Sequence, residues 1–383
     1  MRTLAWIAGF VCLSTVLLDA FQTIVLPRRP RGRFRITRIF YMVTWIPWSA
    51  ITRRVQQRKV RESCYSIYGP GSLLLLIAVW AVLLVTGFAC IYYALGSPFI
   101  DPAVMAGSSP MRTDLYVSGT TLFTLGLGDV VPHAMSVRRL LVLESGMGLG
   151  FVALVIGYLP VVYQAFARRE VSIALLDARA GSPPTATELL RRHSFAAIGD
   201  QKDGVAALIV LLEEWERWSA DLLESHISYP LLCYYRSQHD NQSWLSALVA
   251  VLDACTLLIC SVQDGSARQA QLTFAMSRHA LVDLAQVFGR APFQPSACED
   301  RLGGGQFQVM CEQLGKAGVT ICTDAEANER LQAMRALYEP HACALSAYLG
   351  MPLPRWVPEP KAKDSWQTVA RGNTPASHAD HGH

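Results

Sequence analysis

Long apolar runs, separated by basic or glycine-rich segments, dominate the first 166 residues of the chain. The runs at 4–26, 73–95 and 140–166 are each long enough to cross a bilayer as a helix, which needs about 20 residues at about 1.5 Å each. We therefore expect three membrane spans. The apolar run at 39–51 is too short to span and has arginines on both sides, so we expect it to lie flat in the inner headgroup region.

From residue 167 to about 353 the apolar residues recur with helical spacing among ordinary numbers of charges, which predicts an α-helical domain. The tail at 354–383 is rich in Pro, Lys, Ser and His, and we expect it to be disordered. The apolar run 244–262 has two interpretations. It is either a buried helix of a soluble bundle, which we favour, or a fourth span, in which Asp253 would cost roughly 2.5–3.5 kcal/mol in lipid.

Composition and charge support a membrane protein and suggest its orientation. Apolar residues make up 51% of the chain and charged residues 17%, an excess that a soluble protein would struggle to bury. The net charge of +4 is small, and the basic residues bunch at 28–38 and 53–61, which indicates topology rather than nucleic-acid binding. We expect the cell (inner) membrane, with the N-terminus outside and the helical domain in the cytoplasm. Anionic lipids are expected partners of the two basic clusters.

The ten cysteines form no CxxC pair and no metal-ligand spacing. We interpret them as small apolar residues in a reducing compartment. The sequence predicts no cofactor and no metal beyond a permeant ion.

The segment between the last two spans has the features of an ion filter. A short helix is expected at 114–123, with Asp114 in its first turn, and Thr124-Leu125-Gly126-Leu127-Gly128-Asp129 follows it. Backbone at membrane depth is non-helical only where it lines a cavity. Gly126 and Gly128 permit positive φ angles, so successive carbonyls can point to one side and replace the hydration shell of a cation. One loop supplies one wall, so a closed ring needs several copies.

The stretch from Thr120 to Pro132 resembles the pore signature of the potassium channel family, usually Thr-Val-Gly-Tyr-Gly-Asp, in its bacterial type with one pore loop between two spans. The resemblance implies an all-α membrane protein that forms a homotetramer around a central potassium pathway. Asp129 would stand at the outer mouth, and Gly148 falls where many members have a hinge glycine, although helix packing explains this glycine equally well. The implied ion sites are lined by Thr124, Leu125, Gly126, Leu127 and Gly128.

These features divide the chain into an N-terminal segment 1–68, a pore module 69–168, a helical cytoplasmic domain 169–353 and the tail 354–383. Leu127 stands where the family most often has tyrosine, so the filter lacks a hydroxyl that could brace it. We therefore expect weaker selection of potassium over sodium than in tyrosine-bearing channels. The alternatives are a poorly selective cation channel and a membrane-anchored helical sensor or scaffold that does not conduct.

Other polar residues are candidates for contacts rather than for catalysis. Arg236, His239 and Asp240 form a dense polar cluster without a nucleophile, so we expect no enzyme. The cluster is either a ligand or intersubunit contact or a capped helix junction. Glu144, inside the third span, either braces the pore helix or pairs with neighbouring arginines; we favour the arginines.

Overall fold

The computed structural model describes residues 1–25, 36–100, 110–194, 201–239, 241–262, 266–288, 299–303, 305–319 and 321–358. Within these residues the secondary structure is almost entirely helical, with one two-stranded sheet. The chain falls into two compact units, which we describe separately. The first comprises Met1–Arg54 and Ile67–Gln164, and the second comprises Val55–Ser66 and Ala165–His383. The expected class, an all-α membrane protein, is confirmed.

The first unit contains the apolar helices of the chain. Among the described residues, three helices are long and apolar enough to cross a membrane: Arg2–Val25, Arg58–Ala94 and Met135–Ala180. They correspond to α1 (Arg2–Ala20) with its π-helical extension η1 (Phe21–Val25), to α3 (Arg58–Ala94) and to α5 (Met135–Ala180). Helices α3 and α5 each contribute residues to both units. The three helices agree with the three expected spans.

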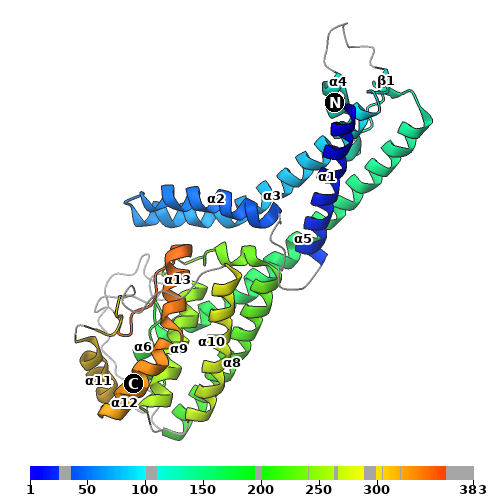
Figure 1. Cartoon of the computed structure of the whole chain (residues 1–383). Coiled ribbons are helices and arrows are strands. Elements are labelled where there is room, and N and C mark those ends of the chain that lie inside the picture. Colours follow the sequence, from blue (N-terminus) through cyan, green and yellow to red (C-terminus); the bar gives the residue numbers. More distant parts are fainter. Residues whose placement is uncertain are drawn as a thin grey trace, which may run out of the picture. The chain divides into compact units, whose positions relative to one another are not determined.

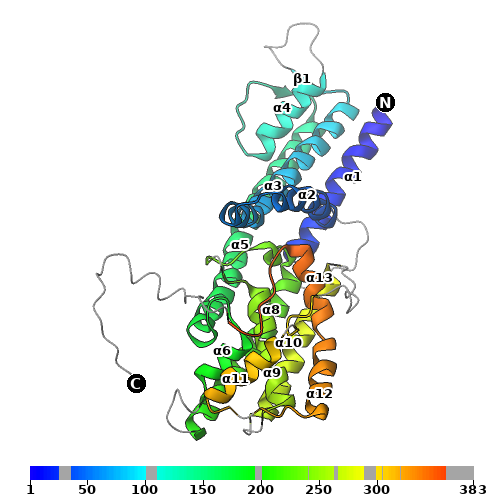
Figure 2. The ribbon, with the colours of Figure 1, turned by 90° about the vertical axis from the view of Figure 1, so that its left-hand side faces the viewer.

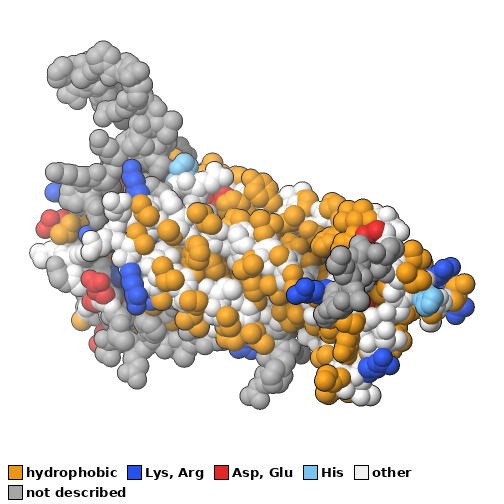
Figure 3. All heavy atoms as spheres, turned by 90° about the horizontal axis from the view of Figure 1, so that it is seen from above, with side chains coloured by type: hydrophobic (Ala, Val, Ile, Leu, Met, Phe, Trp, Pro, Cys, Tyr) orange, Lys and Arg blue, Asp and Glu red, His pale blue; other side chains and the backbone are white. Residues whose placement is uncertain are grey.

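Apolar side chains are exposed along these helices. Figure 3 shows hydrophobic side chains over much of the face that it draws, with charged side chains few and scattered. The exposed apolar residues of the first unit include Leu4, Phe10, Val43, Leu74, Val142, Leu149 and Ile156. Such a surface suits a hydrocarbon environment or contacts with other copies.

Helix α2 (Ile36–Arg53) covers the short apolar run that was expected not to span. It runs crosswise to α1 rather than alongside it (Figure 1). The ring of Trp45, on its buried face, packs edge-on against Tyr68 with the ring centroids 4.7 Å apart. Val43 and Ile51 on its other side are about two-thirds exposed. This division into a packed face and a bare apolar face fits an interfacial helix.

A short sheet closes the loop that carries the filter. Strand β1 (Phe99–Ile100) pairs antiparallel with β2 (Val131–Pro132), so the end of the outer helix α3 is tied to the start of α5. Beneath the sheet lies a small core of Phe88, Tyr92 and Val137. Helix α4 (Pro110–Leu122) and the filter therefore lie within a segment closed at both ends.

The second unit is a helical bundle. Figures 1 and 2 both show its longest helices side by side, and α10 packs against both α8 and α9. Besides the parts of α3 and α5 that belong to it, the unit contains α6 (Ala186–Arg192), α8 (Gln201–Ser228), η2 (Pro230–Tyr234), α9 (Trp244–Cys260), α10 (Ala267–Val287), α11 (Gln306–Lys316), α12 (Ala325–Ala336) and α13 (Glu339–Leu349).

Helix α9 settles the ambiguity of the run 244–262. Every residue of α9 except Ile259 is buried, and the helix is covered by α6, α10, α12 and α13 of its own unit. The Ser243 side chain caps its N-terminus by accepting a hydrogen bond from the Ser246 amide at 3.0 Å. This helix is the centre of a bundle, so the interpretation as a buried helix is supported over a fourth span.

Two boundaries differ from those expected. Trp356 is fully buried, and its carbonyl accepts hydrogen bonds from the amide and the hydroxyl of Thr187, at 3.2 and 2.6 Å. The packed chain therefore continues beyond residue 353, while residues 359–383 of the expected tail lie outside the described residues. Val55–Ser66 groups with the helical unit and not with the N-terminal segment.

The cysteines also depart from expectation at one position. Cys343 is disulfide-bonded. The interpretation that the cysteines are small apolar thiols is therefore wrong for this residue, whereas eight other described cysteines are not in disulfides.

Candidate functional site

The candidate site is the filter segment at the C-terminal end of α4. This helix begins at Pro110, a residue whose fixed φ suits the first turn. Asp114 therefore lies in the second turn rather than in the first, where it was expected. Its fully buried carboxylate accepts a hydrogen bond from the Ser97 hydroxyl at 2.7 Å, which ties the start of α4 to the chain beside β1.

The filter leaves α4 with its backbone still bonded to the last helical turn. The amide of Thr124 donates to the Thr121 carbonyl at 3.0 Å, and the amide of Leu125 donates to the Thr120 carbonyl at 2.8 Å. Beyond this point positive φ angles alternate along the chain, with 57° at Thr124, 53° at Gly126 and 76° at Gly128. The expectation that both glycines adopt positive φ is confirmed.

This alternation is the geometry that turns successive carbonyls toward the same side of a strand. Leu125 and Leu127, between the positive-φ residues, leave more than half of their side-chain surface exposed. Each therefore offers apolar surface that one subunit does not cover. A segment of this kind can line an ion path with its carbonyl oxygens while its apolar side chains pack behind the backbone.

The outer end of the segment is bonded back to α4. The Tyr116 hydroxyl donates a hydrogen bond to the Asp129 carboxylate at 2.6 Å. The structure shows that its hydroxyl holds the residue at the predicted outer mouth, at the end of the filter where Leu127 has no hydroxyl to contribute.

Helix α5 supplies a buried carboxylate that contacts α4. Glu144 has no exposed surface and accepts hydrogen bonds from the Tyr92 and Ser118 hydroxyls, both at 2.5 Å. Arg138 and Arg139 are exposed. The favoured interpretation, pairing with these arginines, is therefore wrong, and the alternative that Glu144 braces the pore helix is right.

Gly148 lies one turn further along α5, where that helix meets the end of α4. A Cβ atom at Gly148 would lie 1.8 Å from the carbonyl oxygen of Leu122. Only glycine allows the two backbones to come so close. Helix α5 continues without a break through this point, so the contact supports the packing interpretation of Gly148 over the hinge.

The described residues of the expected polar cluster, Arg236 and His239, do not form one site. Arg236 donates to the carbonyls of Leu349 and Gly350 at 2.6 and 3.3 Å, and it lies over the ring of Tyr65 with Glu62 at 3.8 Å. His239 is exposed, and Asp240 lies outside the described residues. Arg236 thus caps the C-terminal end of α13, which fits the capped-junction interpretation.

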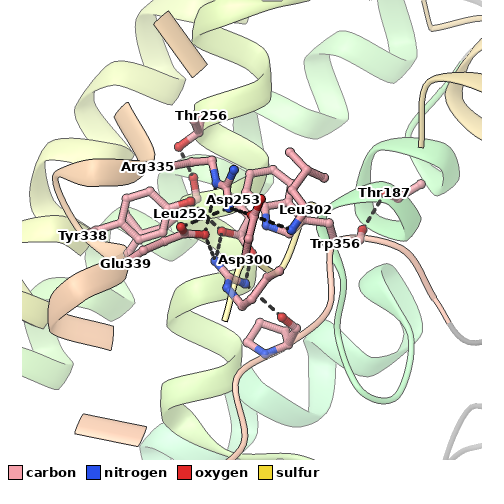
Figure 4. A network of polar contacts seen from close by, with 12 residues as sticks. Thr187, Leu252, Asp253, Thr256, Asp300, Leu302, Arg335, Tyr338, Glu339 and Trp356 are labelled. Carbon is pink, nitrogen blue, oxygen red and sulfur yellow. Dashed lines mark hydrogen bonds and ion pairs between the residues drawn. The ribbon is translucent and has the colours of Figure 1, made fainter. Parts of the chain in front are cut away.

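A second polar network, which the sequence did not reveal, surrounds Asp253 on α9 (Figure 4). The two Nη atoms of Arg301 donate to the two carboxylate oxygens of Asp253 at 2.7 and 2.8 Å, and the Tyr338 hydroxyl donates at 2.5 Å. Arg301 also bonds Glu339, which pairs with Arg335. Burial alone would lower the pKa of Arg301, but Asp253 raises it above the usual range. Arg301 therefore stays charged, and the network joins distant segments of the bundle.

His226 forms a second buried group in this unit. Its Nδ1 donates to the Leu222 carbonyl at 2.8 Å, so Nε2 accepts from the Arg169 guanidinium at 3.1 Å. Burial, and then the charge of Arg169, lower the pKa of His226 well below its usual value. This histidine is therefore a neutral structural residue. Among the described residues, no group of three or more His, Cys, Asp or Glu side chains is placed to hold a metal ion.

Comparison with known proteins locates the same region. Residues 79–165 match the family model described as "Ion channel". This stretch contains the transmembrane part of α3 from Val79 onward, all of α4, the filter and the first part of α5. This stretch is thus similar to an ion-channel module, and residues 124–129 lie inside it.

One relative is similar to a longer part of the chain. The chain is 27% identical over 247 residues to "Uncharacterized membrane protein YdjJ" of Bacillus subtilis (strain 168), in an alignment that covers 64% of this chain and 67% of that protein. That alignment is longer than the 79–165 match, so the similarity extends beyond the pore region. No solved structure is significantly similar to the chain.

Proposed function

We propose that this chain forms a homotetrameric channel that conducts potassium through the backbone carbonyls of residues 124–128. The observation that carries the proposal is the alternation of positive φ at Thr124, Gly126 and Gly128, at the C-terminal end of a short helix between two apolar helices. The negative end of the α4 dipole favours a cation at that place. The match to an ion-channel family over the same residues supports it.

The need for several copies follows from the geometry of one subunit. One filter segment forms one wall, and α5 leaves Val142, Leu149 and Ile156 at least 65% exposed. In a tetramer, α5 would use such residues against neighbouring copies and against lipid. Native mass spectrometry of the detergent-solubilised protein should show four chains, and a monomer or dimer that still carries ion flux would contradict the assembly.

Selectivity is the finer part of the proposal. Potassium should be preferred to sodium, but less strictly than in channels with tyrosine at the position of Leu127, because apolar packing resists small displacements of the carbonyls less than a hydrogen bond does. The bond from Tyr116 to Asp129 supplies part of the missing stiffness at the outer end. In this account Leu127→Tyr raises the preference for potassium where the larger ring is accommodated.

The helical unit would assemble or gate the pore from the cytoplasm, with the N-terminus outside the cell membrane. The basic clusters near the inner surface would then meet anionic lipid. A cysteine introduced at position 34 should accordingly react with a membrane-impermeant reagent from the inside. Reaction from the outside alone would overturn this topology.

Potassium flux into liposomes containing the purified full-length protein tests the proposal. Gly126→Ala forces an L-residue into a positive-φ position and should abolish most of the flux. Gly315→Ala, on α11, adds the same methyl group into open space without a positive φ and should leave the flux unchanged. Equal sodium and potassium flux would favour the poorly selective channel, and the absence of any flux would favour the non-conducting scaffold.

A further inference from the structure

The pore helix α4 is seated on the inner helix α5 through two contacts that lie one helical turn apart on both helices. Ser118 meets Glu144, and Leu122 meets Gly148. Since 118 and 122 are separated by four residues, as are 144 and 148, each pair lies on one face of its helix. The two contacts therefore fix both the distance and the register of α4 against α5.

The Glu144 contact joins three helices and not only two. Its second carboxylate oxygen accepts from Tyr92 on α3, and the Ser118 hydroxyl also lies 2.9 Å from the Val85 carbonyl of α3. Tyr92, Ser118 and Glu144 are all buried, so water does not replace a lost partner there. Among the described residues, no lysine or arginine pairs with Glu144. The carboxylate is held by neutral hydroxyls, so its orientation depends on where α3 and α4 place them.

The filter, in turn, depends on α4. Within the described residues of one subunit, the hydrogen bonds of residues 124–129 all return to this helix, through the carbonyls of Thr120 and Thr121 at the inner end and through Tyr116 at the outer end. A displacement of α4 would therefore be transmitted to the carbonyls that face the ion. Leu127 provides no hydroxyl of its own to oppose such a displacement.

We propose that Glu144 is a positioning residue for the ion filter: by holding α4 to α3 and α5 it sets the spacing of the carbonyls and thereby the preference for potassium over sodium. The inference deepens the proposed function and rests on it. It also assigns Gly148 the role of a contact through which a movement of α5 reaches the filter.

Reversal potentials under opposed potassium and sodium gradients test this role in planar bilayers containing the full-length protein. Glu144→Ala removes both acceptors, and the potassium-to-sodium permeability ratio should fall roughly threefold or more, as expected when about one net hydrogen bond of stabilisation is lost. Glu144→Gln should restore most of the ratio, because its carbonyl accepts from Tyr92 while its amide donates to the Ser118 oxygen.

Asp19→Ala is the matched control. Asp19 is a carboxylate 3% exposed in the same unit, and it is bonded to Thr37 and to the Trp80 indole rather than to α4 or α5. Removing it should affect stability without changing the permeability ratio. An equal fall in the ratio for Asp19→Ala and Glu144→Ala would reduce Glu144 to a general structural role and overturn the inference.

If Glu144→Ala does not assemble, Tyr92→Phe tests the positioning role of Glu144 instead, because it removes one hydroxyl and leaves the ring in place. A smaller fall in the same direction is expected. A selective wild type whose ratio is retained by Tyr92→Phe would contradict the inference while leaving the proposed function intact. A wild type without current would contradict the proposed function itself, and the inference with it.

Discussion

Helices α5 and α9 are both strongly apolar, yet they are built for different surroundings. In the most apolar 18-residue stretch of α5, only 11% of the residues are buried. In α9 every residue except Ile259 is buried by other helices of the same unit. Apolar character alone therefore does not distinguish a span from a bundle core. Length and the supply of partner helices do, since α9 has 17 residues whereas α5 has 46.

One buried carboxylate from each helix shows the same difference. Glu144 of α5 is held by two neutral hydroxyls, whereas Asp253 of α9 is held by the Arg301 guanidinium as well as by a tyrosine. In a bundle, an arginine from a distant loop can pair with a buried carboxylate, so that each charged group has a partner of opposite charge. In the pore module the polar partners come from the apolar helices themselves.

The largest effect should come from breaking the ion pair of α9. Asp253→Ala leaves the buried Arg301 bonded to Glu339 and to the Pro354 carbonyl. Removal of one partner of a buried pair typically lowers the free energy of unfolding by about 3–5 kcal/mol. Urea denaturation followed by tryptophan fluorescence would measure the change. Asp221→Ala removes an exposed carboxylate from the same unit and should change stability by less than about 0.5 kcal/mol. Similar losses for the two variants would refute the structural role of the network.

Replacing one apolar side chain by alanine on each helix tests the comparison between α5 and α9 directly. Leu248→Ala on α9 opens a cavity in a fully buried site and should lower the free energy of unfolding by about 2–5 kcal/mol. Val142→Ala on α5, where the side chain is 74% exposed, should have little effect on the unfolding of the helical bundle. If both variants destabilised the bundle to a similar extent, the exposure of Val142 would not show that its surroundings differ from those of Leu248. The comparison between α5 and α9 would then be contradicted.

A smaller effect is expected from pH. Because the pKa of His226 is lower in the folded protein than the unfolded value of about 6.5, its contribution to stability is present above that pH and is lost as pH falls below it, by at most about 1.4 kcal/mol per pH unit. Melting temperatures between pH 7.5 and 5 should fall less steeply in His226→Gln than in the wild type. His239→Gln, at an exposed position, should follow the wild type. Parallel curves for all three proteins would contradict the assignment of a neutral buried His226.

Much of the architecture could be predicted because it follows from local pattern. The three long helices follow from apolar length, and the positive φ at Gly126 and Gly128 follows from residue type. The remainder depends on contacts between distant segments. Tyr92 lies 52 residues from Glu144 and Arg301 lies 48 residues from Asp253, and no spacing in the sequence indicates such pairs.

The same limit explains the individual errors. Arg236 was grouped with His239 because they are neighbours in sequence, but its partners lie on α13 and at the start of α3. Trp356 was placed in a disordered tail by composition, although its carbonyl is fixed by Thr187. Tyr116 could have been found, since a tyrosine on the pore helix and an acid at the filter mouth are complementary.

The potassium-to-sodium permeability ratio of the wild-type protein, from the reversal potential under opposed gradients, tests the central claim most directly. The account predicts a reversal potential displaced toward that of potassium, and a larger displacement in Leu127→Tyr if the tyrosine ring packs. A reversal potential at zero, with equal passage of both ions, would contradict a filter built from the carbonyls of residues 124–128.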